Sequence, residues 1–232
     1  MKQLKMLAVA LGAVVVSNSA LADPTLWIWD TGGGAGSGSL VPVPAGTGIA
    51  TYANPTFDGA WSVVITTSKT KPATGSATAP MMDLNIQAVS LGVAGRDLHV
   101  SWSDDAFGPF NAALKATMTG HVLSGTGAGA GVRYQSYYQA GAGVWAAAAQ
   151  PSGTWNLYTD SGALPPPVYN STQTGALNQS SFGLTEYVTI TSTPGAAYSL
   201  DAQIVQIPEP STTMLLLGAA VSGLAFLRRK VP

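Results

Sequence analysis

The sequence predicts an all-β domain, an antiparallel β-sandwich or jelly roll, flanked by an N-terminal signal helix and a C-terminal transmembrane helix. Two observations predict the sandwich. About nine short runs rich in β-branched and aromatic residues are separated by Gly-, Pro-, Asn- and Ser-rich segments. Several of these runs carry an apolar residue at every second position, which is the period of a strand with one buried face. A third observation predicts the flanking helices: long uncharged apolar stretches occur at the two ends of the chain.

Composition excludes several classes of protein. Charged residues make up 9% of the 232-residue chain, against roughly 25% in an ordinary globular protein. The chain has no cysteine, which excludes disulfides and Cys-based zinc and iron–sulfur sites. Between Asp23 and Ile207 it has ten acidic and five basic residues, a formal net charge of −5. A body of this charge offers no basic face for nucleic acid.

The first 22 residues have the features of a secretory signal peptide. A positive region with Lys2 and Lys5 precedes an apolar stretch, and Ala20-Leu21-Ala22 is a small-x-small cleavage site. We therefore expect signal peptidase to cut between Ala22 and Asp23. The alternative is an uncleaved anchor, but the apolar run is short for a membrane span.

The body is expected to occupy residues 23–206. Its predicted strands are Thr25–Trp29, Trp61–Ser68, Met82–Leu91, Asp97–Ser103, Ala113–Val122, Val132–Gln139, Thr154–Tyr158, Leu184–Thr191 and Tyr198–Gln206. Two hairpins are expected, one joining the third strand to the fourth and one joining the last two strands through Pro194-Gly195. Long loops are expected at Gly32–Gly48 and Gly162–Gln179.

Residues that carry chemistry are sparse in the body, and no catalytic residue, metal site or cofactor is predicted. His99 and His121 lack the spacing of a zinc site and are expected to be plain surface residues, His99 on an outward face. Asp97, Asp104 and Asp105 are expected to cluster near a turn. Calcium binding there is the alternative to simple solvation, but the ligand spacing of a calcium loop is missing.

Hydrolase signatures are equally weak. Glu186 is the only Glu of the body, and the sequence does not mark it or Asp160 as an acid with a raised pKa. No G-x-S-x-G nucleophile elbow occurs. The Gly-rich Gly32–Gly36 segment lacks the Lys-Ser/Thr of a phosphate-binding loop.

Aromatic residues offer a binding hypothesis. The six Trp residues are expected to serve mainly in the core. In the run Arg133–Gln139, alternation places Tyr134, Ser136 and Tyr138 on one face and Arg133, Gln135, Tyr137 and Gln139 on the other. The second face, with Arg133 and Tyr137, is a candidate polar–aromatic platform for glycans.

The C-terminal segment, residues 207–232, has three parts. A motif at residues 207–211 contains Pro208-Glu209-Pro210, an uncharged stretch follows at residues 212–227, and Arg228-Arg229-Lys230 closes the segment. Sixteen helical residues span about 24 Å, so the flanking basic residues must extend to the interface to complete a membrane span. The positive-inside rule places the basic cluster in the cytoplasm and the body outside.

This order of parts resembles the PEP-CTERM sorting signal, with Ile207 where the family pattern has Val. The resemblance implies a Gram-negative bacterium, and an exosortase that recognises Pro208-Glu209-Pro210, cuts nearby and releases or transfers the protein. The partners it implies are signal peptidase and exosortase as processing enzymes, the inner membrane as a transient anchor, and an exopolysaccharide.

Three hypotheses remain open for the body. The leading one is a non-enzymatic surface or matrix protein with a structural or interaction role in the envelope or exopolysaccharide. The second is a carbohydrate-binding module, which predicts exposed aromatic side chains. The third is a secreted hydrolase, which predicts two facing carboxylates in a cleft.

Overall fold

The computed structural model describes residues 24–33, 38–124, 131–141, 155–159, 168–191 and 193–207. The expected signal peptide with Ala20, Ala22 and Asp23 lies outside these residues, as do residues 208–232 with the expected transmembrane helix and basic cluster. In the ranges just given, no helix is long and apolar enough to cross a membrane. The secondary structure assigned over these ranges consists of strands.

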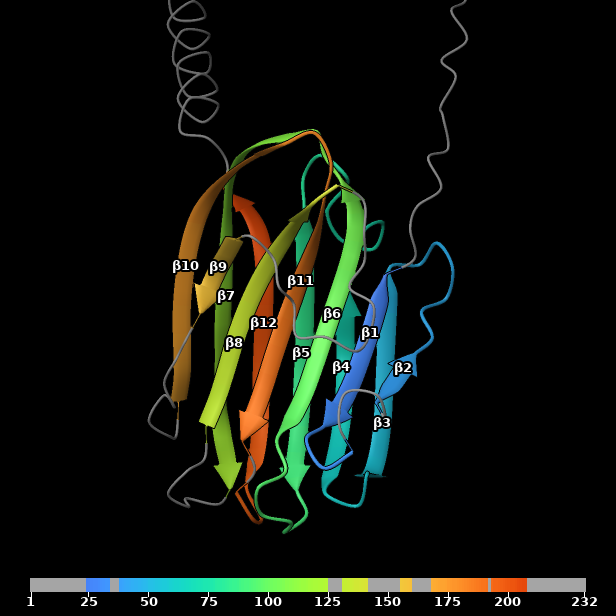
Figure 1. The fold of residues 1–232 in the computed structure, drawn as a ribbon, viewed down its shortest axis with the longest axis vertical. Helices are drawn as coiled ribbons and strands as arrows, with labels where there is room; N and C mark the ends of the chain where they lie inside the picture. The colour runs from blue at the N-terminus through green and yellow to red at the C-terminus, as the bar shows by residue number, and fades with distance from the viewer. Residues whose placement is uncertain are drawn as a thin grey trace, which may run out of the picture.

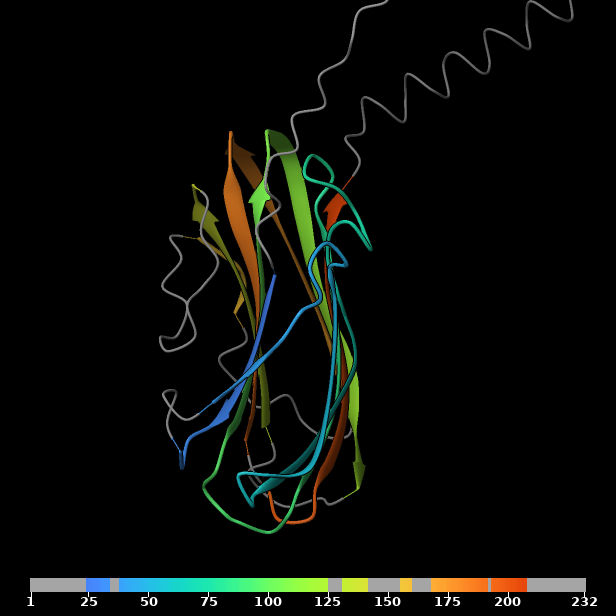
Figure 2. The same ribbon diagram turned by 90° about the vertical axis from the view of Figure 1, so that its right-hand side faces the viewer.

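Twelve strands form two antiparallel sheets that face one another (Figures 1 and 2). The front sheet has the order β2-β1-β6-β11-β8-β9, and the back sheet has the order β10-β7-β12-β5-β4-β3. The front-sheet strands are β1 Thr25–Asp30, β2 Ser39–Val41, β6 Leu98–Phe107, β8 Gly131–Ala140, β9 Trp155–Thr159 and β11 Phe182–Thr191. The back-sheet strands are β3 Ile49–Phe57, β4 Trp61–Lys69, β5 Met81–Ser90, β7 Phe110–Ser124, β10 Val168–Gln179 and β12 Ala197–Ile207. The sandwich predicted from the sequence is therefore confirmed.

The core fills the space between the sheets, and strand alternation builds it. In β5, Leu84, Ile86 and Ala88 are buried, whereas the residues between them are half-buried or exposed. The largest fully buried side chains include Trp61 and Trp102, one from each sheet. Aromatic side chains of this size bury much apolar area, which suits a chain without cross-linking cysteines.

Both predicted hairpins are wrong. β5 lies in the back sheet and β6 in the front sheet, and the same separation holds for β12 and β11. The joining segments have seven and five residues, residues 91–97 and 192–196. Packed sheets lie ~10 Å apart and an extended residue spans ~3.3 Å, so either segment is long enough to cross between sheets. Each strand shows the same apolar alternation whether it pairs with the next strand in a hairpin or faces it from the opposite sheet. The sequence pattern therefore does not distinguish a hairpin from a crossing between sheets.

Three strands were missed, and all three are sheet edges: β2, β3 and β10. β2 falls in the expected loop Gly32–Gly48, and β10 in the expected loop Gly162–Gln179. β10 nevertheless pairs with β7 over its whole length. Edge strands bury less side-chain area, so their sequences show weaker alternation, and β3 carries Pro55 as an edge strand can.

Candidate functional site

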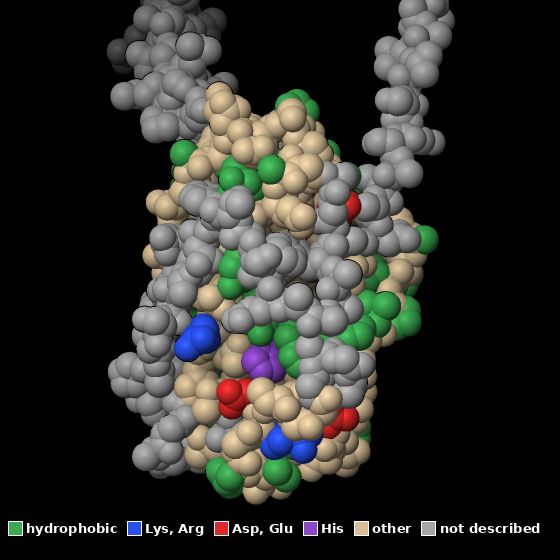
Figure 3. Space-filling view, in the orientation of Figure 1, with side chains coloured by type: hydrophobic (Ala, Val, Ile, Leu, Met, Phe, Trp, Pro, Cys, Tyr) green, Lys and Arg blue, Asp and Glu red, His purple; other side chains and the backbone are tan. Residues whose placement is uncertain are grey.

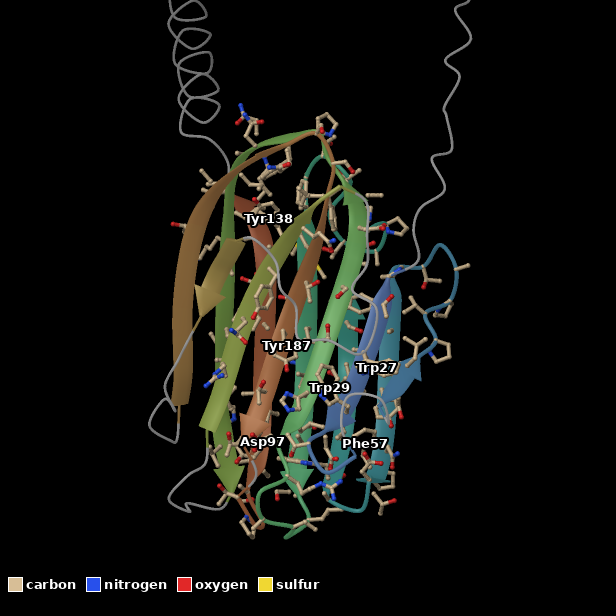
Figure 4. All side chains as sticks on the ribbon, in the orientation of Figure 1. Trp27, Trp29, Phe57, Asp97, Tyr138 and Tyr187 are labelled. Atoms are coloured by element: carbon tan, nitrogen blue, oxygen red, sulfur yellow. The ribbon has the colours of Figure 1, made fainter. Side chains whose placement is uncertain are left out.

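The outer face of the front sheet carries a second apolar cluster, separate from the core. β1 reads TLWIWD, and its Leu26 and Ile28 enter the core. The alternate residues Trp27 and Trp29 therefore project from the other face. Trp29, Tyr137 and Tyr187 form the cluster, with Trp27 packed against it. We call these four residues the outer aromatic cluster; Figure 4 shows Trp27, Trp29 and Tyr187 across the middle of the front sheet.

Strand register brings polar residues into the same face. Trp29 pairs with His99 on β6, His99 with Thr189 on β11, and Thr189 with Arg133 on β8. The next row runs through Trp27, Ser101, Tyr187 and Gln135. Figure 3 shows a histidine beside hydrophobic side chains on this face, with basic and acidic side chains around it.

Three rings at the centre of this face are nearly parallel. The centroids of Trp29 and His99 lie 5.0 Å apart at 12°, and those of His99 and Tyr187 lie 5.9 Å apart at 15°. Trp29 and Tyr187 are 5.7 Å apart at 27°. Such contacts contribute about 0.5–1.5 kcal/mol each beyond area burial, so they fix the orientation of the rings.

Hydrogen bonds hold the histidine in this arrangement. His99 Nδ1 lies 2.8 Å from the Tyr187 hydroxyl and 3.2 Å from Thr189 Oγ1. Burial lowers the pKa of His99, with weaker opposing effects from Asp97 and Asp30. The ring is therefore neutral at pH 7. The sequence placed His99 on an outward face correctly, but the expectation of a plain surface residue is wrong; His121 is exposed as expected.

Two buried polar atoms on this face have no hydrogen-bond partner among the described residues: Trp27 Nε1, a donor, and Gln135 Oε1, an acceptor. Gly38 lies against the Trp27 indole, since a Cβ added at Gly38 would be 2.7 Å from Nε1. Unpaired buried polar groups are rare because each costs about 1–3 kcal/mol.

Strand alternation places the residues of the predicted glycan platform on the outer face, but Gln135 and Tyr137 are buried there and only Arg133 and Gln139 are exposed. Tyr134 and Ser136 are buried and face the core, whereas Tyr137 belongs to the outer aromatic cluster and Arg133 is exposed. Burial raises the pKa of Tyr137 to about 12. Glycan binding by Arg133 and Tyr137 stays a prediction.

The expectation that Trp residues serve in the core holds for Trp61 and Trp102 but not for Trp27 and Trp29. The alternation of β1, in which Leu26 and Ile28 alternate with the two Trp residues, was the signal for this.

The prediction that Asp97, Asp104 and Asp105 cluster near a turn is wrong. Asp97 lies just before the start of β6, at the lower end of the front sheet in Figure 4, whereas Asp104 and Asp105 are near the other end of β6. Asp104 and Asp105 are also buried rather than solvated. Asp104 pairs with Lys71, at 2.8 Å between Nζ and Oδ2. Among the residues that the structure describes, no group of three possible metal ligands occurs.

The environment of Glu186 differs from what the sequence indicated, because nothing in the sequence marked this residue as a buried acid with a raised pKa. Its side chain is fully buried between the sheets, and burial raises its pKa to about 8. Its Oε1 accepts a 3.0 Å hydrogen bond from the Tyr134 hydroxyl, while Oε2 has no partner in the part of the chain that the structure describes. Asp160 lies outside the described residues.

Asp83 and Asp201 share a hydrogen bond, and burial raises the pKa of each. They lie on neighbouring strands, β5 and β12, with half-buried and exposed side chains.

The described part of the chain is thus an all-β domain of two packed antiparallel sheets, with an aromatic and polar outer face on one of them. Residues 206–230 match the family model described as the PEP-CTERM protein-sorting motif. The chain therefore carries a PEP-CTERM sorting motif, and the resemblance drawn from Pro208, Glu209 and Pro210 is confirmed.

Two solved structures illustrate what the sandwich is similar to. The CBM22-1 xylan-binding domain of Paenibacillus barcinonensis Xyn10C is 16% identical, with a TM-score of 0.33, and the match covers 69% of this chain and 86% of that domain. The enzymatically active domain of tailspike protein 4 of bacteriophage CBA120 is 8% identical, with a TM-score of 0.34. That match covers 72% of this chain but only 21% of the tailspike chain. No curated protein matches the sequence.

Proposed function

We propose that this chain is an exported, non-enzymatic protein that exosortase processes at its tail and that serves in the envelope or exopolysaccharide. The observation that carries the proposal is the sorting motif at residues 206–230, which begins where the last strand of the sandwich ends. β12 ends at Ile207 and lies between β7 and β5. A cut near residues 208–211 therefore removes no described strand.

The positions of the acidic side chains support a non-enzymatic role. Glu186 is enclosed between the sheets, and Asp104 is engaged by Lys71. A glycoside hydrolase needs two carboxyl groups facing a substrate cleft. Asp83 and Asp201 are adjacent on a sheet and hydrogen-bonded to each other, so they do not flank a space for a glycosidic bond.

The test is the intact mass and cellular fraction of the protein in its native host, with and without exosortase. We expect a product that begins at Asp23 and ends near residues 208–211, found outside the inner membrane only when exosortase is present. If the chain kept its tail through Pro232 in the inner membrane of both strains, the protein would instead be a single-pass anchored ectodomain.

Polysaccharide binding through the outer aromatic cluster is a second candidate function. The exposed Arg133 and Gln139 favour it, because they lie on the outer face of the front sheet, on the strand that also carries Tyr137 of the outer aromatic cluster. Trp27 is half-buried, so part of its side chain is accessible, and Arg133 is exposed on the same face. Aromatic rings that combine an apolar body with a polar tip are suited to such ligands.

Affinity electrophoresis in gels containing host exopolysaccharide would test this candidate. We expect retardation of the wild type, and at least about a tenfold weaker affinity for Trp27→Ala, equivalent to the loss of about 1.4 kcal/mol. Asp201→Asn, on the outer face of the other sheet, is the matched control and should bind as the wild type does. Equal retardation of Trp27→Ala and wild type would exclude this face.

A further inference from the structure

Lys71 and Asp104 link the two sheets at one end of the sandwich. Lys71 follows β4 of the back sheet, and Asp104 lies on β6 of the front sheet. Their side chains are 4% and 1% exposed, and Nζ lies 2.8 Å from Oδ2. An amine and a carboxyl group are thus held in contact, away from water and 33 residues apart in sequence.

Apolar groups surround this pair. The Lys71 ammonium lies over the Phe107 ring, 4.1 Å from its centroid, and Phe107 packs against Phe182 with centroids 5.7 Å apart. Burial penalises the charged form of a carboxyl group, which favours a protonated Asp104. In agreement, burial raises the pKa of Asp104 despite its hydrogen bonds to Lys71 and Thr70.

Both oxygens of the Asp104 carboxyl group accept further hydrogen bonds. The Thr70 hydroxyl donates to Oδ2 at 2.6 Å, and the backbone N–H of Asp105 donates to Oδ1 at 2.8 Å. Donors placed on both oxygens stabilise the negative charge that develops when a nucleophile adds to the carboxyl carbon.

The residue that follows Asp104 carries a second buried carboxyl group. Asp105 is buried, its Oδ1 has no hydrogen-bond partner among the described residues, and its backbone carbonyl accepts a hydrogen bond from Lys71 Nζ. Burial raises the pKa of Asp105, whereas the charge of Lys71 lowers it to a lesser degree. A carboxyl group in such surroundings can carry a proton between nitrogen and oxygen.

We propose that Lys71 and Asp104 condense to an intramolecular amide that cross-links the two sheets. A proton first passes from the Lys71 ammonium to the Asp104 carboxylate, giving a neutral amine and a carboxylic acid. The Nζ lone pair then adds to the Asp104 carboxyl carbon, and the C–O bond to the hydroxyl breaks. Asp105 moves a proton from nitrogen to that hydroxyl, which leaves as water. Ammonium plus carboxylate becomes amide plus one water, without a cofactor, oxidant or reductant.

Such a cross-link would constrain the chain as a disulfide does in other exported proteins. This chain has no cysteine and cannot form a disulfide. Closing a loop of this length restricts the unfolded state, and the covalent bond would not depend on the redox state of the compartment. The amide would connect the residue that closely follows β4 to β6, and these two strands belong to different sheets.

Mass spectrometry of the purified, folded protein tests the proposal. We expect an intact mass lower than that of the processed sequence by one water molecule. Trypsin cuts after Lys69, Arg96 and Lys115 but not at Lys71, which precedes Pro72. The amide would join peptides 70–96 and 97–115 into one species with two α-amino groups. Labelling of those groups separates it from the continuous peptide 70–115, which has the same mass but one α-amino group.

Variants identify the reacting side chains. Lys71→Arg and Asp104→Ala should restore the full mass and separate the two peptides, and Lys69→Arg is the matched control that should retain the loss of water. Asp104→Asn should form the same amide with loss of ammonia instead. Asp105→Ala should leave a fraction of freshly made protein with the full mass. We expect Lys71→Arg to lower the melting temperature by about 10 °C.

Two results would overturn the proposal. One is a wild-type protein with the full sequence mass that yields peptides 70–96 and 97–115 separately, which would leave Lys71 and Asp104 as a buried ion pair. The other is a loss of water that persists in Lys71→Arg, which would assign the loss to a different residue. The mass and the tryptic peptides of the wild-type protein test the proposal even if a variant fails to fold.

Discussion

At the residue scale, Glu186 is an acid placed where the core is otherwise apolar. Its neighbours on the same face of β11, Leu184 and Val188, are completely buried. The opposite residue on β8 is Ser136, whose hydroxyl is buried and also lacks a partner within the described ranges. A folded-state pKa of about 8 means that Glu186 is protonated at neutral pH, when its carboxyl group can both donate and accept.

The raised pKa of Glu186 predicts that stability falls as the pH rises. In the unfolded chain the group titrates near 4.5, so between pH 4.5 and 8 the folded state holds a proton that the unfolded state has lost. Glu186→Gln should remove this dependence because an amide stays neutral. We expect the wild type to lose about 4 kcal/mol of unfolding free energy across that range relative to Glu186→Gln.

Urea denaturation at several pH values would measure this difference. Asp58→Asn, at an exposed acid, is the control and should retain the pH dependence of the wild type. Parallel pH profiles for the wild type and Glu186→Gln would show that Glu186 is ionised in the folded protein and that its burial is compensated in another way.

At the element scale, the segment between β5 and β6 is fixed to the front sheet by an ion pair. Arg96 in this segment donates to both carboxylate oxygens of Asp30, at 2.9 Å from Nε and 2.6 Å from Nη2. Asp30 ends β1 and is fully buried. The carbonyl of Arg96 also accepts a 3.1 Å hydrogen bond from Trp61 Nε1 of the back sheet. The segment therefore contacts both sheets, as its crossing requires.

Arg96→Met should destabilise the protein by about 3 kcal/mol, because it leaves the buried Asp30 carboxylate without its cation. The shift of the urea midpoint at pH 7 would measure this loss. Arg133→Met replaces an exposed arginine of the same sheet and should change stability by less than about 0.5 kcal/mol. A similar, small effect of both substitutions would mean that Asp30 is stabilised without Arg96.

The accuracy of the sequence prediction at this scale depended on position in the sheet. Interior strands such as β5, β6 and β12 pack one face on the core, so their apolar alternation is strong and each was found. β2, β3 and β10 are edges, where one neighbour is missing and polar residues are tolerated. β10, for example, contains the run Asn170-Ser171-Thr172-Gln173-Thr174, which reads as a loop without its partner β7.

At the scale of the whole molecule, the chain crosses repeatedly between the two sheets. Consecutive strands such as β5 and β6, β6 and β7, and β11 and β12 lie in opposite sheets. The first described strand, β1, pairs with β6, and the last, β12, pairs with β5 and β7. Strands distant in sequence therefore hold each end of the described chain, and exosortase processing beyond Ile207 should leave the sandwich intact.

The sequence by itself determined the all-β class, the faces of the interior strands and the C-terminal sorting motif. Each depends on neighbouring residues: alternation in a strand, or a short motif with fixed spacing. The tertiary structure decided which strands pair, that Lys71 meets Asp104, that Glu186 is buried beside Tyr134, and that Trp27 and Trp29 join Tyr187 on one outer face. These contacts join residues tens of positions apart, and they exist only because strand register and sheet packing bring the residues together.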